Sequence, residues 1–245
     1  MVGTALFPAS LIHILAALLF VVLPVTSRLR YARLNRRLES GDPLARIRAY
    51  QSSVFRGALL LSVICLLPRV AGLSAAQLGF SAPRSWSLTL LLSLGVMVFF
   101  LVSALRIRSR AAAFREKLQG RAGAMLPSSL PELRWFGILS VVGGLFEEAG
   151  YRGFLFYYIR LWLPQINVVA LVLIASLVFG LGHLYQGWKG IAATSAAGLI
   201  LSSVYAATGS LFAPAVIHIF GNMRAVLIFW PGASPTTESP GVPAA

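Results

Sequence analysis

The stretch that decides the fold is WFGILSVVGGLFEEAGYRGFLFYYIRLWL, at positions 135–163. It is mostly apolar and long enough for a membrane-spanning helix of about 20 residues with a shorter continuation. Two adjacent carboxylates, Glu147 and Glu148, nevertheless lie in its middle, and Arg152 follows them. A charge inside a bilayer costs about 2.5–3.5 kcal/mol on insertion scales, so a charged residue there usually has a function. The stretch therefore predicts an intramembrane helix that carries a functional site.

The composition of the whole chain supports a membrane protein. Of its 245 residues, 58% are hydrophobic and 11% are charged, and the mean hydropathy is +0.80. Soluble domains carry about 25% charged residues, so this chain has too little polar surface to face water on all sides. Further apolar stretches lie at 6–26, 54–73, 86–105, 166–184, 190–205 and 211–230. We predict an all-α fold, a polytopic transmembrane bundle of seven or eight helices.

The net charge of +14 comes mainly from two basic clusters, at 28–48 and 106–121. Short basic loops between apolar spans mark the cytoplasmic side, where anionic lipid also attracts them. This rule places the N-terminus outside, and the bilayer is the expected surroundings, most simply a bacterial cytoplasmic membrane. No base-reading fold accompanies the basic residues, so we expect no nucleic-acid partner.

Three regions are expected along the chain. Residues 1–129 form N-terminal transmembrane helices with basic cytoplasmic loops, residues 130–231 form the region with the unusual polar groups, and residues 232–245 form a disordered tail. No signal peptide or internal repeat is evident. The single cysteine, Cys65, is expected to be a small buried hydrophobe.

Acidic and histidine residues are sparse, which makes their positions informative. Five of the seven acidic residues are expected in loops or in the tail: Glu39, Asp42, Glu116, Glu132 and Glu238. The other two are Glu147 and Glu148. Of three histidines, His183 and His218 lie in later apolar stretches, and His13 lies in the first without a partner pattern. The intramembrane polar groups therefore concentrate in the second half of the chain.

Helical spacing pairs these groups. Glu148 and Arg152 are four residues apart and can form an ion pair on one helix face, whereas Glu147 points about 100° away. His218 and Asn222 share the same spacing, as do Phe179 and His183. Each pair alone has a structural explanation, because a Glu–Arg pair can be a packing device and a His–Asn pair can join helices for about 0.6–2 kcal/mol. All of them on successive helices favour a common site.

In this order, the motifs EExxxR (147–152), FxxxH (179–183) and HxxxN (218–222) resemble the CPBP family. This family includes type II CAAX prenyl endopeptidases, bacteriocin-processing proteins and lysostaphin-resistance-like proteins. The resemblance covers roughly 130–230, and one departure is the small pair Ala149–Gly150. It implies an intramembrane endopeptidase that acts on a membrane-associated or lipidated peptide or protein. The implied catalytic residues are Glu147, His183, His218 and Asn222, with Glu148, Arg152 and Phe179 in support.

Peptide hydrolysis needs an activated water, a stabilised oxyanion and a proton for the leaving amine. Glu147 is the candidate general base, and Glu148 holds Arg152. His183 is a candidate for orienting the water or moving the proton, and His218 and Asn222 are candidate oxyanion donors.

Zinc stays open as a cofactor, because Glu147, His183 and His218 form a His₂Glu set, although no HExxH helix is present. We favour a mechanism without metal. Two other functions remain as alternatives: a non-catalytic membrane immunity or scaffold protein, and a proton-coupled transporter. The substrate and the oligomeric state are left open by the sequence.

Overall fold

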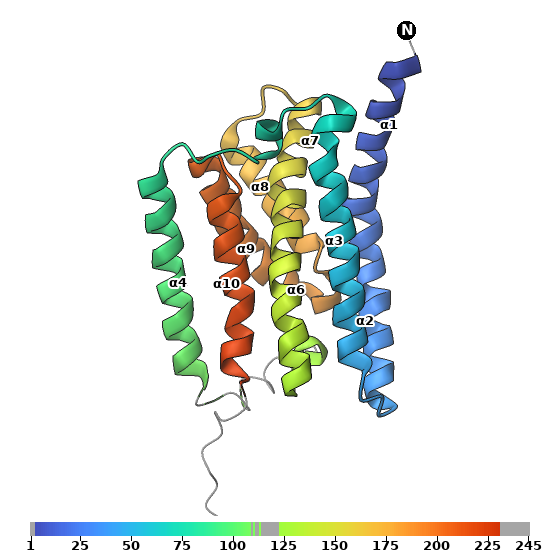
Figure 1. The fold of residues 1–245 in the computed structure, drawn as a ribbon, viewed down its shortest axis with the longest axis vertical. Helices are drawn as coiled ribbons and strands as arrows, with labels where there is room; N and C mark the ends of the chain where they lie inside the picture. The colour runs from blue at the N-terminus through green and yellow to red at the C-terminus, as the bar shows by residue number, and fades with distance from the viewer. Residues whose placement is uncertain (1–2, 109, 111–112, 114–122, 231–245) are drawn as a thin grey trace, which may run out of the picture.

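The computed structural model describes residues 3–108, 110, 113 and 123–230 (Figure 1). The predicted tail and most of the 106–121 cluster lie outside these residues. The α-helices are α1 (Gly3–Ala17), α2 (Leu23–Glu39), α3 (Ala45–Ala71), α4 (Trp86–Arg108), α6 (Leu130–Glu148), α7 (Leu155–Trp162), α8 (Val168–Leu181), α9 (Gly187–Thr208) and α10 (Phe212–Ile228). The shorter turns are η1 (Leu18–Val22), η2 (Ala75–Leu78), η3 (Gly123–Met125), η4 (Ala149–Phe154) and η5 (Leu184–Gln186). Since the described residues contain no strand, the all-α prediction is confirmed.

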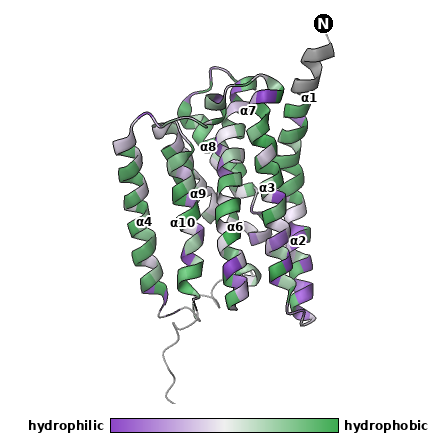
Figure 2. Ribbon diagram, in the orientation of Figure 1, coloured by the Kyte–Doolittle hydropathy of each residue, from purple (hydrophilic) through white to green (hydrophobic). Residues whose placement is uncertain are grey.

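Four helical segments are long and apolar enough to cross a membrane: Ser10–Glu39, Ala45–Ala71, Trp86–Arg108 and Leu184–Thr208. The helices α8 and α10 are apolar but shorter. Large hydrophobic side chains are exposed on the outside of the bundle, for example Leu91 at 70% and Leu94 at 57%. Figure 2 shows apolar residues along much of the bundle, whereas the lower part of α2 is largely hydrophilic. Such an apolar surface is stable against lipid rather than water, so the chain is an integral membrane protein.

The bundle is built around α6. This helix packs against α3 and α10, and α10 also packs against α4 and α9. In Figure 1 the helices α4, α10, α6 and α3 form a row, with α8 and α9 behind it. The basic C-terminal ends of α2 and α4 lie at the same lower end, opposite the N-terminus. The described parts of the two basic clusters therefore share one end of the bundle, as the charge pattern requires.

The deciding stretch forms one continuous helical path. Ser129 caps α6 by accepting from the backbone N–H of Glu132, and Pro131 lies in the first turn, where its missing N–H costs no hydrogen bond. At Ala149 the path continues as the π-helical turn η4 and then as α7. The glycines of this stretch therefore do not interrupt the helical path. In lipid every backbone group must bond internally, which outweighs the helix cost of about 1 kcal/mol per glycine.

Two further expectations from the sequence are wrong. Glu132 is not in a loop but in the first turn of α6, where it is only 5% exposed. Its carboxylate accepts from the backbone N–H of Ser128 at 2.6 Å and lies 3.5 Å from Arg46 of α3, and these partners make its burial possible. Cys65 is exposed rather than buried, because it lies on the outer face of α3. An apolar lipid environment accepts a thiol as readily as a core does.

Close packing around η4 gives a stability prediction. A Cβ atom added to Gly153 would lie 2.5 Å from the backbone oxygen of Leu78, which cannot move as a flexible side chain can. We expect Gly153→Ala to lower the free energy of unfolding by about 1–3 kcal/mol, the usual cost of overpacking. Thermal unfolding in detergent would measure it. In the control Gly143→Ala the new atom meets nothing closer than 3.7 Å, so equal destabilisation of both variants would contradict the prediction.

Candidate active site

A buried ion pair lies at the junction of α6 and η4. The Nη1 atom of Arg152 donates to the Oε1 atom of Glu148 at 2.8 Å, and the two side chains are 0% and 1% exposed. The Nη2 atom of Arg152 donates to the carbonyl oxygen of Gly198 on α9 at 3.2 Å. The guanidinium carbon also lies 4.3 Å from the ring centroid of Phe179 on α8. The pairing predicted from the spacing is thus present, and it ties α6 to α8 and α9.

His218 of α10 lies between the two glutamates. Its Nδ1 atom is 2.6 Å from the Oε1 atom of Glu148, and its Nε2 atom is 3.6 Å from the Oε2 atom of Glu147. The ring of Phe179 packs edge-on against the imidazole of His218, with the ring centroids 5.8 Å apart. Because an ionised carboxylate only accepts, the Nδ1 position donates to Glu148. This bond fixes the orientation of the imidazole and turns its other nitrogen towards Glu147.

His183 lies just beyond the end of α8 rather than inside a span. The helix ends at Leu181, and His183 precedes η5. Its Nδ1 atom donates to the carbonyl oxygen of Phe179 at 3.0 Å, and the two rings lie 5.0 Å apart. The chain can turn here because Gly182 has no side chain: a Cβ atom there would lie 2.4 Å from the hydroxyl oxygen of Tyr151. The predicted span 166–184 is therefore too long. The hydrogen bond to Phe179 uses Nδ1 of His183, so Nε2 is not needed for it.

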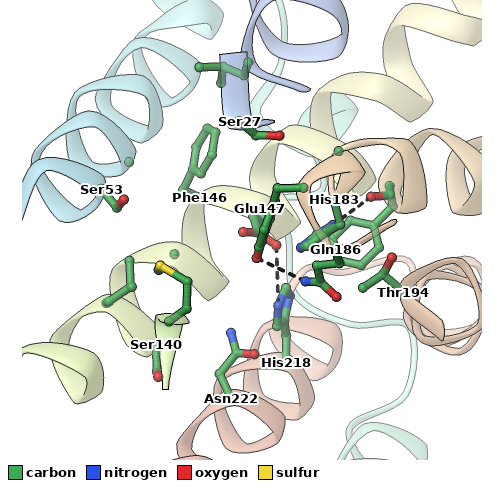
Figure 3. A pocket seen from close by; sticks show the side chains of 18 of the residues that line it. Ser27, Ser53, Ser140, Phe146, Glu147, His183, Gln186, Thr194, His218 and Asn222 are labelled. Carbon is green, nitrogen blue, oxygen red and sulfur yellow. Dashed lines mark hydrogen bonds and ion pairs between the residues drawn. The ribbon is translucent and has the colours of Figure 1, made fainter. Parts of the chain in front are cut away.

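These side chains line one cavity of about 830 Å³. Glu147 comes from α6, His183 from the α8–η5 connection, and His218 and Asn222 from α10. Figure 3 shows the four side chains directed towards a common space, with the Glu147–His218 contact drawn as a dashed line. The cavity also reaches α2 and α3, so both halves of the chain form its walls. The structure thus brings together the four residues named from the sequence.

Packing between helices sets the register of the site. A Cβ atom on Gly144 of α6 would lie 2.8 Å from Cγ1 of Ile219, the neighbour of His218 on α10. Only a glycine permits this approach without a shift, and the approach brings His218 to the level of the glutamates. On the other side of the site, a Cβ atom on Gly198 would lie 3.1 Å from the ring of Phe179.

Two members of the site were missed by sequence reasoning. One is the carbonyl oxygen of Gly198, which any residue type can supply and which therefore leaves no sequence signal. The other is Tyr151, which lines the cavity, is 9% exposed and packs edge-on against Phe179 at 5.1 Å. An aromatic residue in an apolar stretch is usually core or interface, and the one available signal was its position within the EExxxR motif.

The residues suggested for zinc were tested against the geometry. Among the described residues, no three His, Cys, Asp or Glu side chains are grouped so that they could hold a metal ion together. As placed, Glu147, His183 and His218 therefore do not form a three-ligand site. In addition, Nδ1 of each histidine is engaged, with Glu148 in His218 and with a carbonyl oxygen in His183.

One part of the chain matches a known protein family. Residues 129–224 match the family model described as type II CAAX prenyl endopeptidase Rce1-like. This region of the chain is similar to that family. It includes every residue of the three motifs, and it confirms the family named from them. The chain thus carries an Rce1-like region typical of CAAX-type membrane proteases. Neither the curated proteins nor the solved structures that were searched gave a match.

Proposed function

We propose that this protein is an intramembrane endopeptidase in which Glu147 activates a water molecule for attack on a peptide bond. The observation that carries the proposal is the place of His218, held by Glu148 at Nδ1 and facing Glu147 across 3.6 Å at Nε2. This distance is too long for a direct hydrogen bond, and a water beside the two atoms can contact both of them. A water there contacts the general base and lies at the wall of the cavity.

The reaction then follows from the groups at hand. Glu147 takes a proton from the water as the water oxygen attacks the carbonyl carbon of the peptide. The carbonyl oxygen becomes an oxyanion, which accepts hydrogen bonds from the amide of Asn222 and from Nε2 of His218 when this nitrogen carries a proton. The C–N bond breaks, and the proton held by Glu147 passes to the leaving amine. The products are a new carboxyl terminus and a new amino terminus.

The other residues hold this arrangement. Arg152 fixes Glu148, and Glu148 fixes the imidazole of His218, so both are positioning residues rather than reacting groups. Phe179 supports Arg152 with its ring face and His183 with its carbonyl oxygen. His183 is proposed to orient the water or to move the proton through its free Nε2. The site is thus pre-organised before substrate enters, which is the main source of rate in such sites.

The proposed substrate is a peptide segment, membrane-associated or lipidated, that enters the cavity from the bilayer. Residues 130–231 are proposed as the catalytic region, with the N-terminal helices contributing a wall of the cavity. The proposed location is the bacterial cytoplasmic membrane with the N-terminus outside, as the basic clusters indicate.

The direct test is proteolysis by the purified protein in detergent, using acylated peptides and identifying products by mass spectrometry. Because the proposed mechanism uses a glutamate base, we expect cleavage to continue at an unchanged rate after dialysis against a chelator. Metal analysis of the same sample is the control. Loss of cleavage with chelator, and its return with Zn²⁺, would instead assign the His₂Glu alternative. No cleavage of any peptide would favour the non-catalytic membrane partner.

A further inference from the structure

The cavity that contains Glu147 is strongly basic. Among the described residues, Glu147 is the one carboxylate that lines it. Six arginines also line it: Arg30, Arg33, Arg37, Arg48, Arg56 and Arg224. In a cavity between apolar helices each charge interacts more strongly with other charges, because the surroundings screen it poorly. Its interior therefore attracts anionic groups.

Two of these arginines, Arg30 and Arg56, bind neutral groups of their own helices. Arg30 of α2 folds back along its own helix and donates to the hydroxyl of Thr26 and, at 3.1 Å, to the carbonyl oxygen of Leu23. Arg56 of α3 donates to the hydroxyl of Ser53 at 3.1 Å. Both side chains are partly buried. Each guanidinium has five N–H donors, so these neutral contacts leave both the charge and most donors unmatched.

The other carboxylates of the described chain do not pair with them, and Glu39 is exposed and outside the cavity lining. Asp42 pairs with Arg48 at 3.0 Å, and Glu132 pairs with Arg46. Glu148 is taken by Arg152 and His218. Among the described residues, neither Arg30 nor Arg56 forms an ion pair with a carboxylate. Burying unpaired cations is costly, so an external anion is the natural partner.

The helices that carry the two arginines pack near the segment that carries Glu147. The position of a Cβ atom on Gly57, next to Arg56, lies 3.6 Å from Cγ1 of Val142 and 3.8 Å from Cβ of Phe146. Phe146 immediately precedes Glu147. On α2, the Leu23 carbonyl that Arg30 contacts lies one turn from Phe20, whose ring is 5.6 Å from the ring of Tyr151. Tyr151 is one turn beyond Glu147. A ligand held by these arginines therefore lies in the same cavity as Glu147.

We propose that Arg30 and Arg56 form a subsite for a carboxylate of the bound peptide, either its C-terminus or an Asp or Glu side chain. The proposal rests on the proposed function, because the same cavity must take up a peptide. Arginine suits this ligand, since its planar fork matches a carboxylate with two parallel hydrogen bonds. A lipid phosphate is the less favoured source, because both guanidinium groups share the cavity with Glu147 rather than the outer surface, where Arg36 is exposed.

Binding can be measured without cleavage by using the Glu147→Gln protein in nanodiscs. The probes are acylated fluorescent peptides of one sequence, in which an internal Glu is replaced by Gln, the free C-terminus by an amide, or both. We expect the peptide without either carboxylate to bind roughly 10- to 100-fold more weakly, as for a lost charge-assisted hydrogen bond. The two single replacements show which carboxylate is recognised.

Variants of the arginines complete the test. Arg30→Gln and Arg56→Gln should remove most of the preference for the acidic peptide and leave binding of the neutral peptide nearly unchanged. The matched control is Arg36→Gln, on the same helix as Arg30 but exposed and outside the cavity lining. It should keep the full preference. Arg56→Lys should keep part of it, which a purely structural role would not predict.

Two outcomes would overturn the proposal. One is equal binding of acidic and neutral peptides to the protein with both arginines present. The other is a preference that disappears when anionic lipid replaces zwitterionic lipid in the nanodisc, because lipid phosphate would then be the ligand. Failure of the peptidase proposal looks different, since acidic peptides would bind to the unaltered protein and remain uncleaved.

Discussion

Replacing Glu147 by Gln is expected to lower kcat for peptide cleavage by about 10²–10⁴, the range that a positioned general base contributes. The amide has nearly the same shape but cannot accept a proton from water. The fold should survive, because Glu147 faces the cavity with its side chain 26% exposed and Glu148 keeps both of its own partners. Quantified product formation, with thermal unfolding of the same preparation, checks both parts.

The neighbouring residues give this prediction its controls. Glu39→Gln alters a carboxylate that is exposed and outside the cavity lining, so it should cleave at the original rate. Asn222→Ala should also lose activity, by about 10²–10³, as is usual when an oxyanion donor is removed. If Glu147→Gln and His183→Ala both kept the original rate, the peptidase mechanism given above would be wrong. The transporter alternative would then be tested by proton uptake.

Replacing Arg152 by Met is expected to cause the largest loss of stability, about 3–5 kcal/mol, because it leaves the buried carboxylate of Glu148 without its cation. The Met side chain is apolar and of similar length, so packing against Phe179 is partly kept. Unfolding by heat or by denaturing detergent would measure the loss. Activity should fall with it, since Glu148 also orients His218.

A double variant separates charge from packing in this prediction. Glu148→Gln together with Arg152→Met removes both charges, and we expect it to be more stable than Arg152→Met alone. Arg160→Met on α7 is the matched control, because Arg160 is exposed and should change stability by less than about 0.5 kcal/mol. If the double variant were as unstable as the sum of its parts, burial of an unpaired charge would not be the cause.

Much of the candidate site was predictable because its pairs are local. The four-residue spacing of Glu148 and Arg152 places both on one helix face whatever surrounds the helix, and the ion pair is present at 2.8 Å. The same reasoning failed at His183. An apolar period extends to Leu184, but the helix ends at Leu181, where Gly182 meets Tyr151 and the chain turns. Helix ends depend on contacts that the sequence pattern does not contain.

The burial of Glu132 and the exposure of Cys65 were also not predictable from the sequence pattern. Glu132 follows a Pro, which is typical of a loop, yet Arg46 of another helix and the Ser128 backbone allow its burial. Cys65 lies in an apolar run that gave no indication of which face would meet lipid. Hydropathy separates membrane from water, but it does not separate lipid-facing from buried positions, because both are apolar.

The sequence by itself determined that this chain lies in a membrane, that it is helical, and that its unusual intramembrane polar groups concentrate in EExxxR, FxxxH and HxxxN. Composition and helical periodicity are properties of single segments, so they need no partner. Only the tertiary structure placed His218 between Glu147 and Glu148, put the Gly198 carbonyl against Arg152, and opened the cavity towards Arg30 and Arg56. These relations depend on the register between helices, which close contacts such as Gly144 with Ile219 set across the bundle.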